Sequence, residues 1–279
     1  MRIALLQIST NSDKMDNFAL LRDAAEKAAE QGARVLVFPE ATSQSFGTGR
    51  LDTQAEELDG EFSTAVKELA DELGVVIVAG MFTPADTVQR GEKTISRVNN
   101  TVLISGAGLH QGYNKIHTYD AFGYRESDTV KPGDELVVFE VDDIKFGVAT
   151  CYDIRFPEQF KDLARNGAQV ILVPTSWQDG PGKLEQWQLL PRARALDSTS
   201  WIVACGQARL PEELRDKRNG PTGIGHSMVA NPHGQVIVSA GYEPEMLIVD
   251  IDVSDLSKIR EALPVLEAQD PQAIPSKPA

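Results

Sequence analysis

The sequence predicts an α/β fold in which helices and buried strands form stacked layers. Two observations indicate this fold class. Short runs rich in Val, Ile and Leu alternate along the chain with amphipathic helical patterns. Several of these runs are apolar at nearly every position, as expected of strands that have helices on one face and a second layer on the other. With 279 residues, 42% of them hydrophobic, the chain is long enough to bury a large core.

The strand runs and helical patterns follow one another from the N-terminus onward. Strands are predicted over residues 3–8, 34–38, 75–79, 101–105, 136–141, 145–149, 170–173, 201–204, 227–230, 236–239 and 246–251. Helices are predicted over residues 13–31, 61–73, 157–166, 183–198 and 254–263. Phe18, Leu21 and Ala25 fall on one stripe of the first helix, so that face is expected to pack on a sheet. Gly32 and Gly74 are suitable helix ends.

Turn residues predict hairpins as well as crossover connections. Asp142-Asp143 lies between two apolar runs, and Asn231 to Gly234 forms a second turn signal. No linker-like composition interrupts residues 1–263, which we interpret as a single domain. Residues 264–279 contain four prolines in sixteen residues. This segment is expected to be either a disordered tail or an arm packed on a neighbouring subunit.

Charge and composition exclude several classes of partner. A net charge of −14 and a pI near 4.8 argue against nucleic acid and against an anionic membrane, since both attract clustered Lys and Arg. No apolar stretch approaches the ~20 residues of a membrane-spanning helix, and the first residues do not resemble a secretory signal. We therefore expect a cytoplasmic protein. Its two cysteines, Cys151 and Cys205, form no disulfide framework and are expected to remain thiols.

Three reactive side chains follow the ends of apolar strands. Cys151 comes directly after a strand run, Glu40 follows residues 34–38 and Pro39, and Lys115 follows the strand pair that begins near residue 101. An isolated Cys is most often a buried small hydrophobe, and an isolated Glu or Lys is most often a solvated surface charge. Carboxyl ends of strands are the edge where α/β sheets commonly build sites. Together the three residues predict an active site.

The chemistry of these groups explains why they would converge. A thiol near its reference pKa of ~8.5 is mostly protonated at neutral pH, so Cys151 needs a base or a neighbouring cation before it attacks a carbonyl. Glu40 is the candidate base. Lys115 and the backbone N–H of Tyr152 are candidate donors to the oxyanion that forms. The reaction that this set can run is acyl transfer through a thioester.

The sequence segments around these residues resemble those of the nitrilase superfamily of carbon–nitrogen hydrolases, whose signature is a Glu-Lys-Cys triad in that chain order. The matching segments are Val37-Phe-Pro-Glu40, Tyr113-Asn-Lys115-Ile-His117 and Cys151-Tyr-Asp-Ile-Arg-Phe-Pro-Glu158, followed by Pro191-Arg-Ala-Arg-Ala195, Gly225-His-Ser227, Asn231-Pro-His-Gly234 and Leu263-Pro-Val265. The resemblance implies a four-layer α-β-β-α sandwich that forms a homodimer, with the C-terminal arm crossing to the partner. It also implies hydrolysis without a metal or cofactor.

The resemblance assigns roles to two further residues. Many members carry a second glutamate in a segment of the form Glu-Ser followed by Pro-Gly, here Glu126-Ser127 and Pro132-Gly133, and we expect Glu126 to position Lys115 and substrate. The Cys151 segment is most similar to the branch of omega-amidases and deaminated glutathione amidases. In that branch an arginine four residues after the Cys, here Arg155, binds the substrate carboxylate. The alternative for Arg155 is a salt bridge within its own loop.

One segment departs from the pattern of that branch. Where the branch has a Thr before a Gly-Pro pair, this chain reads Pro174-Thr-Ser-Trp-Gln-Asp-Gly-Pro181 and places Asp179 at the position that contacts substrate. An acidic side chain there would repel a carboxylate and would instead attract an amino group. Two classes of substrate therefore remain open, amides that bear a carboxylate and other amides.

Aromatic residues near the strand ends are candidates for the walls of the substrate pocket. Phe46 and Trp177 lie in loops that leave catalytic strands, and we expect both to contact substrate. Tyr119, Phe122 and Tyr124 crowd the segment between Lys115 and Glu126, and for the last two a place in the core is an equal alternative. The four histidines show no zinc-site spacing, and no phosphate-binding glycine pattern is present.

Other functions remain open at this stage. Nitrile hydrolysis and N-carbamoyl amino acid hydrolysis use the same triad as an amidase. A Cys-His enzyme of the glutaminase or protease type would need a histidine base, and His226 is the candidate. A catalytically idle binding or scaffold protein would not depend on Cys151 at all. Our preferred interpretation is an amidase that acts on a small amide bearing a carboxylate and releases ammonia.

Overall fold

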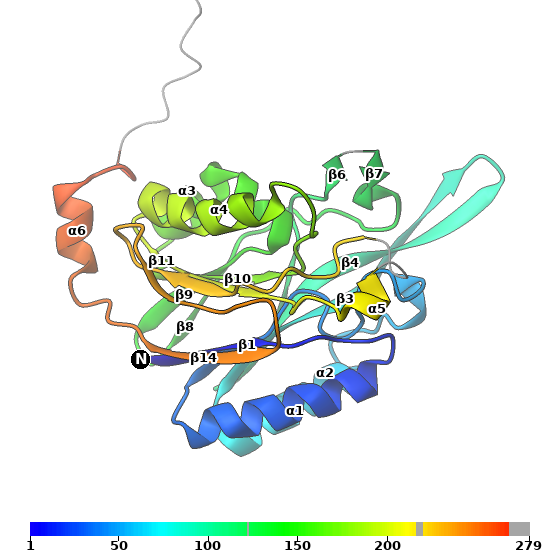
Figure 1. Cartoon of the computed structure of the whole chain (residues 1–279), viewed down its shortest axis with the longest axis horizontal. Helices are drawn as coiled ribbons and strands as arrows, with labels where there is room; N and C mark the ends of the chain where they lie inside the picture. Colours follow the sequence, from blue (N-terminus) through cyan, green and yellow to red (C-terminus); the bar gives the residue numbers. More distant parts are fainter. Residues whose placement is uncertain (122, 216–219, 268–279) are drawn as a thin grey trace, which may run out of the picture.

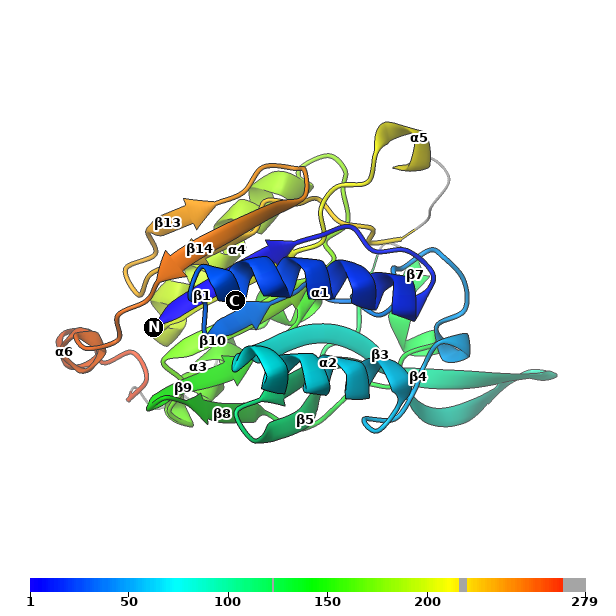
Figure 2. The same cartoon turned by 90° about the horizontal axis from the view of Figure 1, so that it is seen from below.

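A computed structural model describes residues 1–121, 123–215 and 220–267. In this part of the chain, two β-sheets face each other and each carries two helices on its outer side (Figures 1 and 2). Helices α1 and α2 cover one sheet, whereas α3 and α4 cover the other. The four-layer α-β-β-α sandwich expected from the sequence is therefore confirmed.

The first sheet combines the N-terminal third of the chain with its last strand. Within the described residues it has six strands, of which β1, β2 and β3 are mutually parallel neighbours. In spatial order they are β14 (Glu245–Asp250), β1 (Arg2–Gln7), β2 (Val35–Val37), β3 (Val76–Arg90), β4 (Lys93–Gly106) and β5 (Leu109–Asn114). The helices on this sheet are α1 (Lys14–Glu30) and α2 (Glu61–Leu73).

The second sheet is built from the middle of the chain. Its described strands also number six, and its parallel neighbours are β9, β10 and β11. In spatial order they are β13 (Val236–Ser239), β12 (Met228–Ala230), β11 (Trp201–Gly206), β10 (Val170–Thr175), β9 (Ile144–Val148) and β8 (Val137–Val141). The remaining elements are the helices α3 (Pro157–Arg165), α4 (Lys183–Ser198), α5 (Glu212–Arg215) and α6 (Leu256–Ala262) and the short strands β6 (Asp120–Ala121) and β7 (Tyr124–Arg125).

The alternation of side chains along β1 shows why its apolar run forms a central strand. Successive residues of a strand point to opposite faces of the sheet. Ile3 and Leu5 pack between the two sheets, whereas Ala4 and Leu6 pack under the helices of the first sheet. Because both faces are buried, apolar residues are favoured at both sets of positions, and Ile3 to Leu6 form a continuous apolar run.

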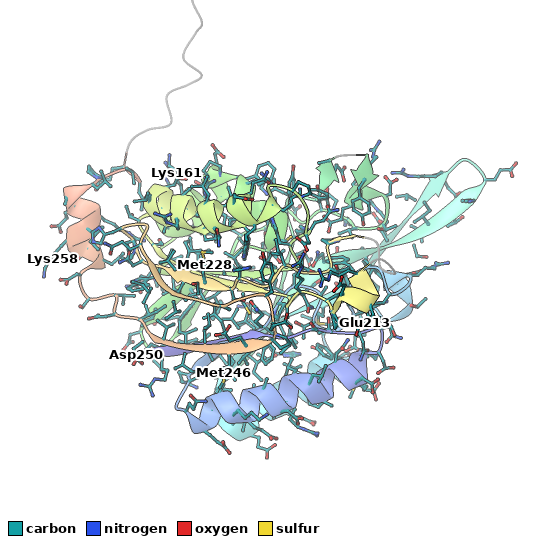
Figure 3. The ribbon with its side chains drawn as sticks, viewed as in Figure 1. Lys161, Glu213, Met228, Met246, Asp250 and Lys258 are labelled. Carbon is teal, nitrogen blue, oxygen red and sulfur yellow. The ribbon has the colours of Figure 1, made fainter. Side chains whose placement is uncertain are left out.

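Helix ends follow the capping signals in the sequence. The Asp13 carboxylate accepts hydrogen bonds from the N–H groups of Met15 (2.9 Å) and Asp16 (3.0 Å), which fixes the start of α1. Gly74 ends α2 in the left-handed conformation (φ 65°). Charged side chains such as Lys161, Glu213 and Lys258 project from the surface, whereas Met228 lies inside the molecule (Figure 3). Charged residues are thus at the surface and apolar ones in the core, as is usual in folded proteins.

Two strands are longer than the sequence predicted. Strands β3 and β4 pair far beyond the predicted 75–79 and 101–105 segments and project from the body of the protein (Figure 1). Residues 84–97 are mostly polar and none of them is buried, so this outer part of the hairpin has no apolar face that a sequence pattern would show. No bounds were predicted for β5, the second strand of the pair that begins near residue 101, since its run contains His110, Gln111 and Gly112 and has little apolar character.

Two predictions concern the end of the chain, a helix over 254–263 and a tail or arm over 264–279, and the second of them stays a prediction. The predicted helix over 254–263 is α6, and the chain is described as far as Glu267. Most of the Pro-rich segment 264–279 lies outside the described residues. In the part of the chain that is described, no helix has both the length and the apolar character needed to cross a bilayer.

Candidate active site

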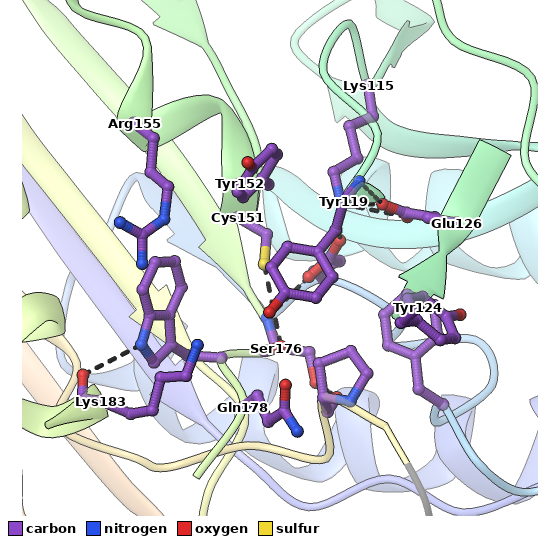
Figure 4. Close-up of a pocket in the computed structure, with 14 residues that line it drawn as sticks. Lys115, Tyr119, Tyr124, Glu126, Cys151, Tyr152, Arg155, Ser176, Gln178 and Lys183 are labelled. Atoms are coloured by element: carbon purple, nitrogen blue, oxygen red, sulfur yellow. Dashed lines mark hydrogen bonds and ion pairs between the residues drawn. The ribbon is translucent and has the colours of Figure 1, made fainter. Parts of the chain in front are cut away.

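Most of the predicted site residues meet where the ends of strands from both sheets come together (Figure 4). Glu40 follows β2, Lys115 follows β5, Cys151 follows β9, and Ser176 follows β10. These elements border one cavity, whose described lining residues are Glu40, Phe46, Lys115, Tyr119, Tyr124, Glu126, Cys151, Tyr152, Arg155, Ser176, Trp177, Gln178, Lys183 and Pro221. The structure thus brings together residues that span much of the sequence.

The backbone of Glu40 lies against Gly80 of the neighbouring strand β3, where a larger residue would not fit. The N–H of Gly80 on β3 donates to the carbonyl of Pro39 at 3.0 Å. A Cβ on Gly80 would lie 2.6 Å from Cα of Glu40, closer than real Cβ contacts allow. Glycine at this position therefore permits the close approach of two backbones that places the Glu40 carboxylate inside the molecule.

Cys151 begins a short 3₁₀ turn, η3 (Cys151–Arg155), in a strained backbone conformation. Its φ is +48°, a region that residues other than glycine rarely adopt. The turn is stabilised by a capping box in which the N–H of Thr150 donates to Asp153 at 2.9 Å. A strained residue maintained by its surroundings, at the end of a strand, is typical of a nucleophile that must project into a cavity.

Asp153 links this turn to the segment that carries Lys115. Its buried carboxylate accepts hydrogen bonds from the hydroxyl of Tyr113 (2.6 Å) and from the N–H of His117 (2.9 Å). Tyr113 and His117 flank Lys115 in the sequence, so the same carboxylate fixes the positions of both the cysteine turn and the lysine segment. The sequence motifs gave no indication of this role of Asp153.

Lys115 lies between two buried carboxylates. Its Nζ is 3.2 Å from Oε1 of Glu40, 2.9 Å from Oε2 of Glu126 and 3.1 Å from Oε1 of Glu126. Burial by itself would lower the pKa of Lys115, but the charges of Glu126 and Glu40 outweigh that effect and raise the pKa well above its ordinary value. Lys115 is therefore a permanent cation in this cavity.

The pKa values of Glu40 and Cys151 are both raised above their ordinary values. Burial raises the pKa of Glu40, an effect that the charge of Lys115 offsets only in part. Burial, and next the negative charge of Glu40, raise the pKa of Cys151 well above 9.0. The resting nucleophile is thus a thiol whose proton must be removed, and the neighbouring group with a raised pKa is suited to accept it.

Two polar contacts to Glu40 were missed by sequence reasoning. The Nδ2 of Asn100 donates to Oε1 of Glu40 (2.8 Å) and of Glu126 (3.3 Å), and the backbone N–H of Ser176 donates to Oε2 of Glu40 (2.8 Å). Asn100 is fully buried in the middle of β4. Its neighbours Asn99 and Thr101 are also polar, so the local sequence does not mark Asn100 as a site residue. The contact from Ser176 uses only the backbone and leaves no signal in the sequence either.

Most of the residues predicted to form the walls of the pocket line this cavity. Phe46, Tyr152, Arg155 and Trp177 all belong to its lining, as do Tyr119 and Tyr124, while Phe122 lies outside the described residues. The Arg155 guanidinium donates to Gln186 (2.5 Å), and its Cζ lies 5.1 Å from the centre of the Trp177 ring. The cavity is narrow, about 30 Å³, and shares Phe46, Tyr124 and Pro221 with a neighbouring groove of about 620 Å³.

The prediction for Asp179 does not match the structure. Asp179 is absent from the cavity lining, and its carboxylate forms a salt bridge of 2.6 Å with Arg209. The Arg209 guanidinium also stacks over the Tyr242 ring at 4.7 Å. Because Arg209 lies on a different loop, distant in sequence, the local motif gave no indication that Asp179 would turn toward it and away from the substrate cavity.

His226 and Cys205 lie apart from the cavity lining. The ring of His226 packs edge-on against Tyr242 at 4.3 Å, and burial lowers the pKa of His226. Cys205 is buried between the sheets, and burial raises its pKa to about 12. Among the residues that the structure describes, no group of three or more His, Cys, Asp or Glu side chains is arranged to hold a metal ion.

Comparison with known protein families gives a match over nearly the whole chain. Residues 2–261 match the family model described as carbon-nitrogen hydrolase. A hydrolase of Mycobacterium tuberculosis is 46% identical over an alignment of 280 positions, which covers 96% of this chain and 95% of that protein. The omega-amidase NIT2 of Danio rerio is 32% identical over 271 residues, covering 95% of this chain and 92% of that protein.

Solved structures show the same architecture. Nit3 of Saccharomyces cerevisiae, described as a member of branch 10 of the nitrilase superfamily, superposes with a TM-score of 0.78 at 25% identity, covering 98% of this chain and 96% of that chain. The NitN amidase of Nesterenkonia sp. AN1 superposes with a TM-score of 0.71 at 26% identity, covering 94% and 97%. The resemblance noted from the sequence motifs is confirmed by both kinds of comparison.

Proposed function

Since the chain belongs to the carbon–nitrogen hydrolase family, we propose that it hydrolyses an aliphatic amide to a carboxylate and ammonia through a thioester on Cys151. The observation that carries this proposal is the convergence of Glu40, Lys115 and Cys151 on one narrow cavity. A thiol with a raised pKa, a carboxylate with a raised pKa and a fixed cation are the three groups that acyl transfer requires.

In the proposed reaction, Glu40 accepts the thiol proton while the sulfur of Cys151 forms a bond to the amide carbon. The carbonyl oxygen becomes an oxyanion that Lys115 and the backbone N–H of Tyr152 stabilise. The protonated Glu40 then gives its proton to the amide nitrogen, the C–N bond breaks, and ammonia leaves the thioester. Water attacks the thioester and gives one proton to Glu40. The C–S bond breaks, Glu40 returns that proton to the thiolate, and the acid product loses its remaining proton to solvent and leaves as a carboxylate.

A small substrate with a carboxylate at its far end fits the walls of this cavity best. The cavity beside Cys151 is narrow, which favours a short acyl group. Arg155 borders the same cavity, and its planar guanidinium suits a carboxylate. The omega-amidase NIT2 of Danio rerio, to which this chain is similar, is named for an activity on amides. Nitriles and N-carbamoyl amino acids are the alternative substrates, because the same three groups can process them.

The proposal is tested by measuring ammonia release from a panel of omega-amides, neutral aliphatic amides, nitriles and N-carbamoyl amino acids. Wild-type protein is compared with Cys151→Ala and with Cys205→Ala, which removes a thiol outside the cavity. We expect activity that Cys205→Ala retains and Cys151→Ala loses, together with a Cys151 acyl adduct in mass spectra of quenched reactions. If no compound gives Cys151-dependent ammonia, the hydrolase proposal fails and the idle scaffold is favoured.

We also propose that the protein forms a homodimer through the outer face of the second sheet and its helix α4. Leu189 and Leu196 of α4 are 61% and 47% exposed, and Val236 and Ile237 of edge strand β13 are 42% and 45% exposed. Such an apolar surface is typical of a subunit interface. Analytical ultracentrifugation of wild type and Leu189→Glu tests it: a monomeric wild type would contradict the proposal, and a dimer that the substitution weakens would support it.

A further inference from the structure

The loop between β10 and α4 forms one side of the cavity. Residues 176–182 have neither helical nor strand structure, and most of them are exposed. The start of the loop and the residue directly after it line the cavity, with Ser176, Trp177, Gln178 and Lys183. Figure 4 shows Ser176, Gln178 and Lys183 along the same side of the thiol. Because a surface loop with few buried residues opens at low cost, the shape of this wall depends on the contacts that hold the loop.

Asp179, in the middle of the loop, forms a salt bridge with a residue of another segment. Its Oδ2 lies 2.6 Å from a guanidinium nitrogen of Arg209, and its Oδ1 accepts a hydrogen bond from the N–H of Gly180 at 2.8 Å. The side chains of Asp179 and Arg209 are only 31% and 29% exposed. One carboxylate thus joins the bend of the loop to Arg209, at a point between the two ends that line the cavity.

Arg209 is itself held by the body of the protein. Its backbone N–H donates to the carbonyl of Tyr242 at 2.8 Å, and its Cζ lies 4.7 Å from the centre of the Tyr242 ring. These contacts use the backbone and the ring face of Tyr242, which a phenylalanine would keep. Two residues before Arg209, the side-chain amide of Gln207 donates to the backbone carbonyl of Glu40 at 3.1 Å. The partner of Asp179 is therefore fixed relative to the proposed base.

The start of the loop is attached to the same region by aromatic contacts. The ring of Trp177 lies 5.4 Å from that of Trp187 on α4, and the indole N–H of Trp187 donates to the carbonyl of His226 at 2.8 Å. The ring of His226 in turn packs against Tyr242 at 4.3 Å. Packing thus holds the Trp177 end of the loop, whereas the salt bridge of Asp179 holds the exposed bend that follows.

We propose that the salt bridge between Asp179 and Arg209 positions the loop 176–182 as a wall of the cavity, and that both residues raise substrate affinity in this way. The inference rests on the proposed function, in which the substrate lies between this wall and Cys151. Neither Asp179 nor Arg209 belongs to the described cavity lining, so both are positioning residues. A wall that is ordered before binding spares the substrate the cost of ordering it, which favours binding and leaves the steps at the thiol unchanged.

Steady-state kinetics with a neutral aliphatic amide test this role, because an uncharged substrate responds little to a change in net charge. For Arg209→Gln and for Asp179→Asn we expect KM to rise ~3- to 10-fold with kcat nearly unchanged, the size expected of a partly exposed salt bridge. The double variant should show no further rise, because both substitutions remove the same contact. Arg209→Lys keeps the charge and should stay closer to wild type than Arg209→Gln.

Asp142→Asn is the matched control. It removes an exposed salt bridge of 2.8 Å with Arg34, outside the cavity lining, and should change neither kcat nor KM. Three kinetic results would overturn the inference. These are a wild-type KM in both single variants, strictly additive rises in the double variant, and a fall in kcat together with the thermal midpoint at unchanged KM, which would indicate a general loss of structure.

A second measurement needs no turnover. N-ethylmaleimide is uncharged and bulky for a cavity of about 30 Å³, so a loosened wall should admit it more readily to Cys151. We expect Cys151 of Arg209→Gln to be modified ~3- to 10-fold faster than in wild type, in line with the loss of one such salt bridge, whereas Asp142→Asn should react as wild type does. Intact-protein mass spectrometry measures the rate, and the fully buried Cys205 is the internal reference.

The modification rate separates this inference from the proposed function. Equal rates in Arg209→Gln and wild type would overturn the inference even if the protein releases ammonia from an amide. Faster modification of Arg209→Gln, without ammonia release by the wild type from any compound of the panel, would support the positioning of the loop and contradict the proposed function.

Discussion

The backbone N–H of Ser176 donates a 2.8 Å hydrogen bond to Oε2 of Glu40, and this contact joins the two sheets at the active site. Glu40 follows β2 of the first sheet, whereas Ser176 follows β10 of the second. The carbonyl of Ser176 also lies 3.8 Å from Sγ of Cys151. The orientation of the proposed base relative to the nucleophile therefore depends on the packing between the sheets, in which the apolar faces of β2 and β10 participate.

Replacing Glu40 by Gln should remove the base with little change in shape. The amide oxygen of the glutamine can still accept from Ser176, but the side chain can no longer take the thiol proton. We expect kcat to fall by ~10²- to 10⁴-fold, the usual contribution of a general base, with a thermal midpoint close to that of wild type. Glu68→Gln, at an exposed position of α2, is the matched control. Activity of Glu40→Gln near the wild-type value would contradict the role of Glu40.

The pH dependence of kcat/KM follows from the raised pKa of Glu40. Burial raises that pKa above its ordinary value of 4.5. The reaction needs Glu40 in its unprotonated form, so activity is lost as pH falls through the raised pKa. For a neutral amide, whose own charge does not titrate, we expect an acid limb with its midpoint above 4.5. A midpoint at or below 4.5, in buffers where the protein remains folded, would contradict this assignment.

The buried charges around Lys115 predict a coupled effect on stability. Lys115→Met leaves Glu40 and Glu126 buried without their shared cation, and breaking such a buried pair usually costs about 3–5 kcal/mol of unfolding free energy. Glu126→Gln added to Lys115→Met removes one of the two stranded carboxylates and should recover part of that loss. Urea denaturation of the single and double variants measures the coupling. Strictly additive effects would show that the three groups do not act as a unit.

The sequence predicted those site residues that a pattern in neighbouring residues identifies. Glu40 and Cys151 could be predicted because each follows an apolar strand, and Lys115 because it follows a strand pair. Where an apolar run gives way to polar residues, the strand ends, so the sequence shows where the edge of the sheet lies. Glu126 could be placed only through the family motif. Lys183 was missed because its position depends on how α4 begins, beside Trp177 and Tyr119.

The errors arose where a residue's partner is distant in sequence. Asp179 was expected to face the substrate because of its place in a local motif, yet the structure pairs it with Arg209 from another loop. The layers of the sandwich were predictable from buried strands such as β1, since burial on both faces produces a continuous apolar run. The outer part of the β3–β4 hairpin was not, because a ladder of backbone hydrogen bonds between solvated strands requires no apolar pattern.

Tyr113 should affect catalysis through the turn that carries Cys151. Its hydroxyl donates to Asp153 (2.6 Å) and accepts from Gln159 (2.8 Å). Tyr113→Phe leaves the buried Asp153 carboxylate with one donor fewer, which should reduce the unfolding free energy by about 1–3 kcal/mol. As a positioning residue it should lower kcat with little change in KM. Tyr242→Phe, outside the cavity lining, is the control. Loss of stability without any change in kcat would limit Tyr113 to a structural role.

His226→Ala distinguishes the proposed mechanism from a Cys-His mechanism. The His226 ring packs against Tyr242, outside the cavity lining, and burial lowers its pKa, so it is expected to remain neutral near pH 7. We therefore expect less than a ~10-fold loss of kcat/KM, which corresponds to no more than about 1.4 kcal/mol of barrier, accompanied by a lower thermal midpoint from the lost ring packing. A Cys-His enzyme would instead lose ~10²- to 10⁴-fold with its base. Steady-state kinetics on the best substrate of the ammonia panel, measured below the melting transition, separates the two outcomes.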